Sequence, residues 1–130
     1  MNMLKVSRSA GSMAKSNVES GHKAILDSLL LDIPGVVEGK MFGHAAYYVN
    51  GKLFACIHGG GVGVKVLEGI ANKLLSEQRA VPFQPMDKPK MREWVQINRA
   101  RSADYRKDIG ILRTSVQFVS HLRSVKSRNL

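Results

Sequence analysis

The residues best suited to chemistry in this sequence are Cys56 and His58, two positions apart, together with His44 upstream of them. Because side chains alternate along a strand, Cys56 and His58 would share one face of a strand over residues 53–58. Zinc needs three or four ligands, and no further Cys or His pair follows at ligand spacing. We therefore expect Cys56 to be a buried structural cysteine, with no metal and no cofactor. A small-molecule or enzymatic site near these three residues is the alternative.

The glycine-rich run from Gly59 to Lys65 resembles loops whose backbone N–H groups hold a phosphate. A Walker A loop needs Gly-Lys followed by Ser or Thr and then a helix, whereas Lys65 lies between two valines in an expected strand. In the dinucleotide fingerprint, Val64 would replace the last glycine. The run therefore predicts a hairpin turn rather than a nucleotide site.

Groups for acid–base or nucleophilic catalysis are scattered. No Gly-x-Ser-x-Gly motif occurs, and the carboxylates fall at expected helix ends and turns, where capping and solubility explain them. These carboxylates are Asp27, Asp32, Glu38, Glu68 and Asp87. The sequence therefore predicts that the protein is not an enzyme.

Positive charge is concentrated at the two ends of the chain. The sequence holds 20 Lys and Arg against 10 Asp and Glu, for a net charge of +10, while residues 17–98 are almost balanced. No RNA-binding, zinc-finger or helix-turn-helix motif accompanies the bases, and aromatic residues make up only 6%. A weak, sequence-independent nucleic-acid interaction is thus an alternative function. Its candidate residues form the densest basic cluster: Arg99, Arg101, Arg106, Lys107 and Arg113.

The length and composition indicate one folded domain, since 130 residues with 44% hydrophobic content can bury a single core. The single cysteine, Cys56, cannot form an intrachain disulfide, which favours a reducing compartment and a cytoplasmic location. The longest stretches without charge are well short of the roughly 20 apolar residues that a membrane helix needs. We therefore expect no membrane association.

The first half of the sequence predicts one helix and three strands. Ser16 and Glu19 form a capping box, after which apolar residues recur at helical spacing until Pro34-Gly35. Alternating residues over 45–49, 53–58 and 62–66 then predict three strands, with Asn50-Gly51 as a hairpin turn. These strands would form an antiparallel meander.

The second half predicts a short helix over 67–75. The proline-bearing segment 81–89 predicts at best an edge strand, together with a loop. A further strand over 91–98 would turn Val95 and Ile97 inward and leave Trp94 on the opposite face. Trp94 is thus a candidate interface residue, through which the chain would bind a protein partner or form a homodimer. Ser102 is expected to cap a final helix that extends to about residue 122.

Several of these segments resemble the TfoX N-terminal domain family and, more distantly, the YjbR and MmcQ group. The resemblance spans roughly residues 23–122 and involves Met41-Phe42-Gly43, Asn50-Gly51-Lys52-Leu53-Phe54-Ala55, Val62-Gly63-Val64-Lys65, Pro82-Phe83 and Met91-Arg92-Glu93-Trp94-Val95. It implies a small α+β domain with an antiparallel sheet flanked by helices and no catalytic residues to carry over. TfoX proteins are regulators of natural competence genes, and the full regulators carry a second, helical domain.

Together these patterns predict a single α+β domain in the order α-β-β-β-α-β-β-α. Residues 16–123 would form the folded domain, between a basic, flexible tail at 1–15 and a basic tail at 124–130. The expected function is that of a non-enzymatic interaction or regulatory module that acts through protein–protein contacts.

Overall fold

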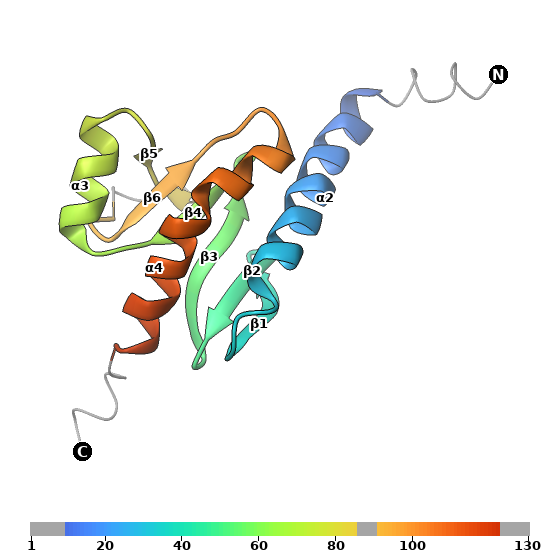
Figure 1. The fold of residues 1–130 in the computed structure, drawn as a ribbon. Coiled ribbons are helices and arrows are strands. Elements are labelled where there is room, and N and C mark those ends of the chain that lie inside the picture. Colours follow the sequence, from blue (N-terminus) through green and yellow to red (C-terminus); the bar gives the residue numbers. More distant parts are fainter. Residues whose placement is uncertain (1–9, 86–90, 123–130) are drawn as a thin grey trace.

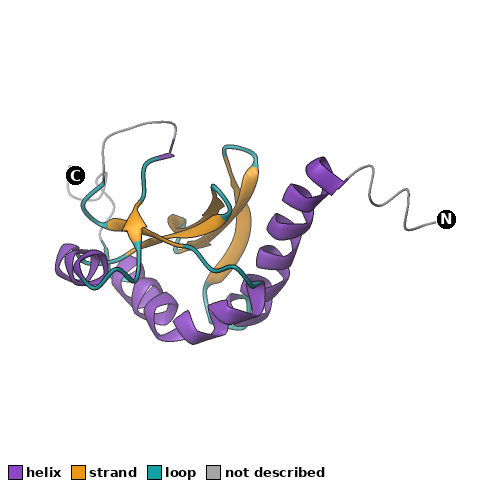
Figure 2. Cartoon of the chain, turned by 90° about the horizontal axis from the view of Figure 1, so that it is seen from above, coloured by secondary structure: helices purple, strands orange, loops and turns teal. Residues whose placement is uncertain are grey.

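A computed structural model of the protein describes residues 10–85 and 91–122. Its helices lie on one face of a single antiparallel sheet of six strands, in the order β1-β2-β3-β4-β6-β5 (Figures 1 and 2). The elements are α2 (Ala10–Leu30), β1 (Val36–Met41), β2 (His44–Val49), β3 (Lys52–His58), β4 (Gly61–Lys65), α3 (Glu68–Ser76), β5 (Val81–Pro82), β6 (Trp94–Ile97), the 3₁₀ helix η2 (Ser102–Asp108) and α4 (Ile109–Ser120).

The predicted α+β class and the meander are confirmed, because β2, β3 and β4 pair in sequence through tight turns. Asn50 and Gly51 both have positive φ, as their hairpin requires. The short helix and the edge strand at Val81–Pro82 also lie where the sequence placed them. In the part of the chain that the structure describes, no helix is long and apolar enough to cross a membrane.

The predicted bounds of the first helix are wrong at both ends, and one strand of the sheet was not predicted. The helix begins at Ala10 rather than Ser16, so residues 10–15, expected in the tail, are helical and the capping box lies inside the helix. The sequence upstream of Ser16 contains good helix formers such as alanine, methionine and lysine and no proline to end the helix. The helix ends at Leu30, before the Pro34-Gly35 pair that was expected to end it. Strand β1 was not predicted, because its residues do not alternate in polarity. The remaining expected tail residues, 1–9 and 124–130, lie outside the described residues.

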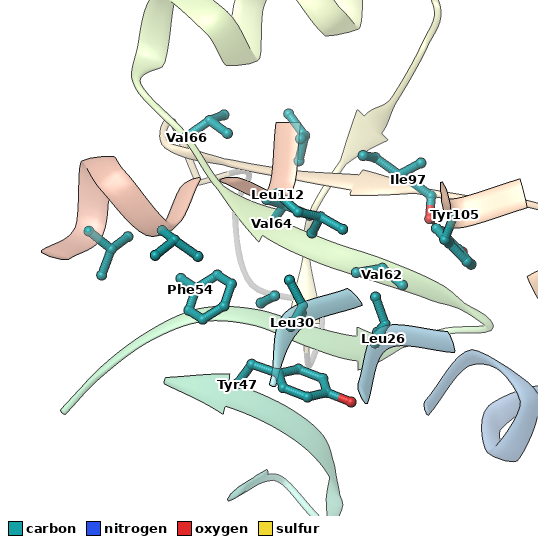
Figure 3. Packing of buried hydrophobic residues seen from close by; sticks show 14 of the residues in the cluster. Leu26, Leu30, Tyr47, Phe54, Val62, Val64, Val66, Ile97, Tyr105 and Leu112 are labelled. Carbon is teal, nitrogen blue, oxygen red and sulfur yellow. Dashed lines mark hydrogen bonds between the residues drawn. The ribbon is translucent and has the colours of Figure 1, made fainter. Parts of the chain in front are cut away.

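The main core lies between the helices and one face of the sheet (Figure 3). Leu26 and Leu30 of α2 are fully buried there with Tyr47 of β2 and Phe54 of β3. From here on we call this side of the sheet the helix face. β2 presents Ala45, Tyr47 and Val49 to this core.

The segment predicted as one final helix is divided into η2 and α4, and Ser102 does not cap it. The Ser102 hydroxyl instead lies 2.7 Å from Nδ1 of His22, whose Nε2 donates to the Gly60 carbonyl oxygen at 3.0 Å. Gly21 permits this close approach of α2 to η2, because a Cβ there would stand 2.8 Å from Ser102 Oγ. The buried His22 therefore ties α2 to η2 and to the turn before β4.

Candidate functional site

The structure brings the predicted chemical residues to one end of β2 and β3. Cys56 and His58 project to the second face of the sheet, which is the face opposite the helices, whereas His44 contacts α2. Ala46 pairs with Cys56, so His44 at the start of β2 and His58 at the end of β3 lie beyond that pair at the same end. His44 is half-exposed, and its Nδ1 lies 2.7 Å from a carboxylate oxygen of Glu19 on α2. The three residues are therefore neighbours, as the sequence suggested, but one of the histidines is already engaged.

The chemistry available to this group is weak. Cys56 is 1% exposed, and burial raises the pKa of its thiol to about 12, so it carries no thiolate near neutral pH. Burial lowers the pKa of His58, and the nearby His44 lowers it further. Across residues 10–85 and 91–122, no three His, Cys, Asp or Glu side chains are grouped to hold a metal ion. The arrangement favours a structural cysteine over a nucleophile or a ligand.

Trp94 is covered by the chain itself. It projects to the second face as predicted, but it is only 6% exposed because the Phe83 ring stacks on it at a centroid distance of 5.1 Å. Phe83 also meets the edge of the His58 ring at 5.4 Å and lies directly above Gly63, where a Cβ would stand 2.5 Å from the ring. Trp94, Phe83, Ala46 and Cys56 thus form a second small core. Trp94 needs no partner chain to cover it.

The predicted basic cluster does not present all of its charges to solvent. Nε and Nη2 of Arg99 donate to the two carboxylate oxygens of Asp108 at 3.0 and 2.8 Å, and Asp108 is 3% exposed. This bonding raises the pKa of Arg99. The pair joins the end of β6 to η2, which makes Arg99 a structural residue rather than a free phosphate contact.

The other four bases are exposed, and two of them, Lys107 and Arg113, lie on different flanks. Lys107 lies 3.9 Å from Asp104 and lines a depression beside α3. Arg113 lines a separate groove beside α2. Arg101 is exposed just before η2, and Arg106 is exposed within it. The structure therefore divides the predicted cluster instead of gathering it into one positive surface.

The groove beside Arg113 has a volume of about 690 Å³ and runs between the C-terminal end of α2, the turn that follows it and α4. Leu29, Ile33 and Val116 give it an apolar wall, and Asp32 and Arg113 place opposite charges along it. Its size and mixed lining suit a small amphipathic molecule. It lies on the helix face, away from His44, Cys56 and His58, so it is not the small-molecule site that the sequence suggested.

The strand that the sequence missed, β1, forms an open edge of the sheet. β1 pairs only with β2 among the described strands, so its outer backbone groups face outward. Side chains on both of its faces are exposed, among them Val37 at 57% and Glu38. The β1–β2 turn adds Phe42, which is 59% exposed and has a φ of 53°. We call Val36–Phe42 the β1 edge.

The β1 edge is bonded to neighbouring elements even though it is exposed. Nζ of Lys23 on α2 donates to carboxylate oxygens of Asp27 and Glu38, both at 2.8 Å, which connects the helix to the strand. On the other side, the ring of Tyr48 packs over Gly39, and its hydroxyl donates to the carbonyl oxygen of Lys40 at 2.8 Å. The edge is therefore a preformed surface. In the sequence, the one sign of strand β1 is the pair Val36-Val37 directly after the Pro34-Gly35 turn.

The comparison with known proteins agrees with the fold and with the resemblance read from the sequence. The sequence model of the TfoX N-terminal domain family matches residues 28–119, which include all six strands, α3, η2 and most of α4. No curated protein and no solved structure matches the sequence. The matched region covers well over half of the chain, and the protein therefore belongs to the TfoX N-terminal domain family.

Proposed function

We propose that this protein is a non-enzymatic interaction and regulatory module that acts through protein–protein contacts at the β1 edge. The observation that carries the proposal is the exposure of a six-residue edge strand on both of its faces. A long edge strand is a site for pairing with another chain, because its unpaired N–H and C=O groups recruit other strands. An apolar side chain, Val37, and the neighbouring Phe42 add contact area beside these backbone groups.

The strained conformation of Phe42 supports the same proposal. A bulky residue with a φ of 53° is uncommon, and the strain costs on the order of 1 kcal/mol or more. The side chain recovers little of this cost by burial, since 59% of it remains exposed. Aromatic residues are enriched where proteins bind one another, so contact with a partner would account for Phe42.

We also propose that the protein has no catalytic activity and acts in the cytoplasm. The neutral, buried Cys56 and the engaged His44 argue against a nucleophile and base at the only cluster that suggested one. A single free cysteine suits a reducing compartment.

A nucleic-acid function has less support, because Arg99 is paired and the remaining bases are divided between flanks. Binding of labelled duplex and single-stranded DNA at low and near-physiological salt tests it. We expect any binding to disappear at the higher salt. Binding that persists there and falls when Arg106 and Arg113 are neutralised would favour the nucleic-acid function instead.

The proposed function can be tested in cells by placing a photo-crosslinking amino acid at Val37. A matched control carries the same amino acid at Leu67, which is an apolar residue of similar exposure, 50% against 57%, just before α3. Illumination should give a discrete protein adduct from position 37 and none from position 67. Equal adducts at both positions, or none at position 37, would overturn the proposal.

A further inference from the structure

The two edges of the sheet are built differently. β5, at one end, has only two residues and includes Pro82, which cannot donate to a further strand. β1, at the other end (Figure 1), has six residues and no proline. Proteins commonly blunt an edge by shortening it or by adding proline, as at β5. β1 is not blunted in either of these ways, although it carries two charges.

The two charges of β1 are placed symmetrically about Gly39. Glu38 and Lys40 flank the glycine and both project to the helix face, because they pair across to Tyr47 and Ala45 of the main core. Val37 and Met41 lie one position farther out and share the second face with Gly39. The order of residues along the strand is therefore apolar, acidic, glycine, basic, apolar. In an antiparallel pair of two such strands, the acidic residue of each would lie opposite the basic residue of the other.

We propose that the β1 edge binds the β1 edge of a second copy of this chain, antiparallel, about a twofold axis at Gly39. In that register Glu38 of each copy lies opposite Lys40 of the other, and Val37 opposite Met41. The six strands of each copy would then continue into one sheet across the dimer. The inference rests on the proposed function and names its partner as an identical chain.

Charge selects this register over its neighbours. An axis at Glu38 would set two carboxylates against each other, and an axis at Lys40 would oppose two ammonium groups. Like charges directly opposite one another destabilise a strand pair, whereas opposite charges stabilise it. Because the dimer is symmetric, the favourable pair forms twice. A lysine alone would blunt the edge, but together with Glu38 it makes the edge specific for its own copy.

The groups that face the charged pair are compatible with the dimer. Lys23 donates to Glu38 from α2, so each Glu38 would lie between two ammonium groups and share them. The Tyr48 hydroxyl already donates to the Lys40 carbonyl oxygen, which keeps a second lone pair for a partner. Phe42, just past the end of the strand, would lie opposite Val36 of the second copy.

A charge-swap experiment tests the register. The mass of the purified chain is measured by sedimentation equilibrium over a range of concentrations for the wild type, Glu38→Lys, Lys40→Glu and the double variant. Circular dichroism checks that each variant folds. We expect the wild type to form a dimer. The dissociation constant of the dimer should rise about ten- to a hundredfold in each single variant, because two pairs become repulsive, and it should return toward the wild-type value in the double variant. Glu77→Lys, which changes the net charge equally at the C-cap of α3, should leave the dimer unchanged.

The outcomes separate this inference from the proposed function. Single variants that weaken the dimer, with recovery in the double variant, support pairing of Glu38 with Lys40 between copies. A wild-type chain that stays monomeric at all concentrations overturns the inference, as does a dimer that the single variants leave intact. An adduct of Val37 with a different protein in the crosslinking experiment would then preserve the proposed function. A second copy in that adduct would support both.

Discussion

Replacing Phe83 with alanine would remove the lid of the second small core. The Phe83 ring is 1% exposed, stacks on Trp94 and lies directly above Gly63. The other buried members of this core among the described residues, Ala46 and Cys56, are small and lie on paired strands, so they can fill little of the space. Truncation would leave a cavity above Gly63 and expose the indole to water.

The magnitude follows from the burial of the ring. Phe→Ala changes in cores cost about 3–5 kcal/mol, and loss of the stacked pair belongs to that sum. Proteins of this size are stable by about 5–15 kcal/mol, so Phe83→Ala should still fold at 25 °C. We expect it to lose about 3–4 kcal/mol and roughly 10–20 °C in Tm.

The assay uses the fact that Trp94 is the only tryptophan. Urea unfolding followed by fluorescence reports on Trp94, and circular dichroism reports on the whole fold. In Phe83→Ala the native emission should shift to longer wavelength, toward that of the unfolded chain. Phe42→Ala is the matched control: the same atoms are removed from a ring that is 59% exposed, and stability should change by less than about 0.5 kcal/mol at concentrations where the chain is monomeric.

An unchanged native emission together with a loss below about 1 kcal/mol would refute the reasoning. It would mean that something other than Phe83 covers Trp94. Trp94 would then be restored as a candidate interface residue.

Three further predictions concern the buried His22 and Asp108 and the partly buried His58. His22→Ala, which removes both ring hydrogen bonds between α2 and its neighbours, should cost about 2–4 kcal/mol in urea unfolding. Asp108→Ala should lower the free energy of unfolding by about 2–4 kcal/mol, because it leaves Arg99 unpaired. Once Asp108 is already alanine, the further change Arg99→Ala should lower the free energy of unfolding much less than Arg99→Ala alone does. The pKa of His58 is lowered in the folded state, so below about pH 6.5 the unfolded chain binds more protons than the folded chain does. The free energy of unfolding should therefore fall as the pH falls through this range. His58→Gln should lose less stability than the wild type between pH 7 and pH 5.

Local patterns predicted the strands whose alternate residues lie in different surroundings. β2 alternates between two cores, with Tyr47 in one and Ala46 in the other, and this period is visible in the sequence. The Asn50-Gly51 turn is similarly local, since both residues tolerate positive φ. These features depend on near neighbours and need no knowledge of the tertiary structure.

The features that the sequence could not supply depend on distant partners. Ser102 has the residue type of a cap, but its hydroxyl is used by His22, which is eighty positions away. Arg99 reads as a free base until Asp108 is seen beside it, and Trp94 reads as unpaired until Phe83 is placed on it. β1 was not predicted, because an edge strand exposed on both faces has no buried face that requires apolar and polar residues to alternate.

The central claim is that β1 is the surface through which this protein binds, with a second copy as the partner. Amide hydrogen exchange of the purified chain at low and high concentration tests it most directly. The account predicts that amides of residues 36–42 become more protected as the concentration rises, while those of β4, paired on both sides within one chain, are protected throughout. Exchange at residues 36–42 that does not change with concentration, while another surface becomes protected, would contradict it.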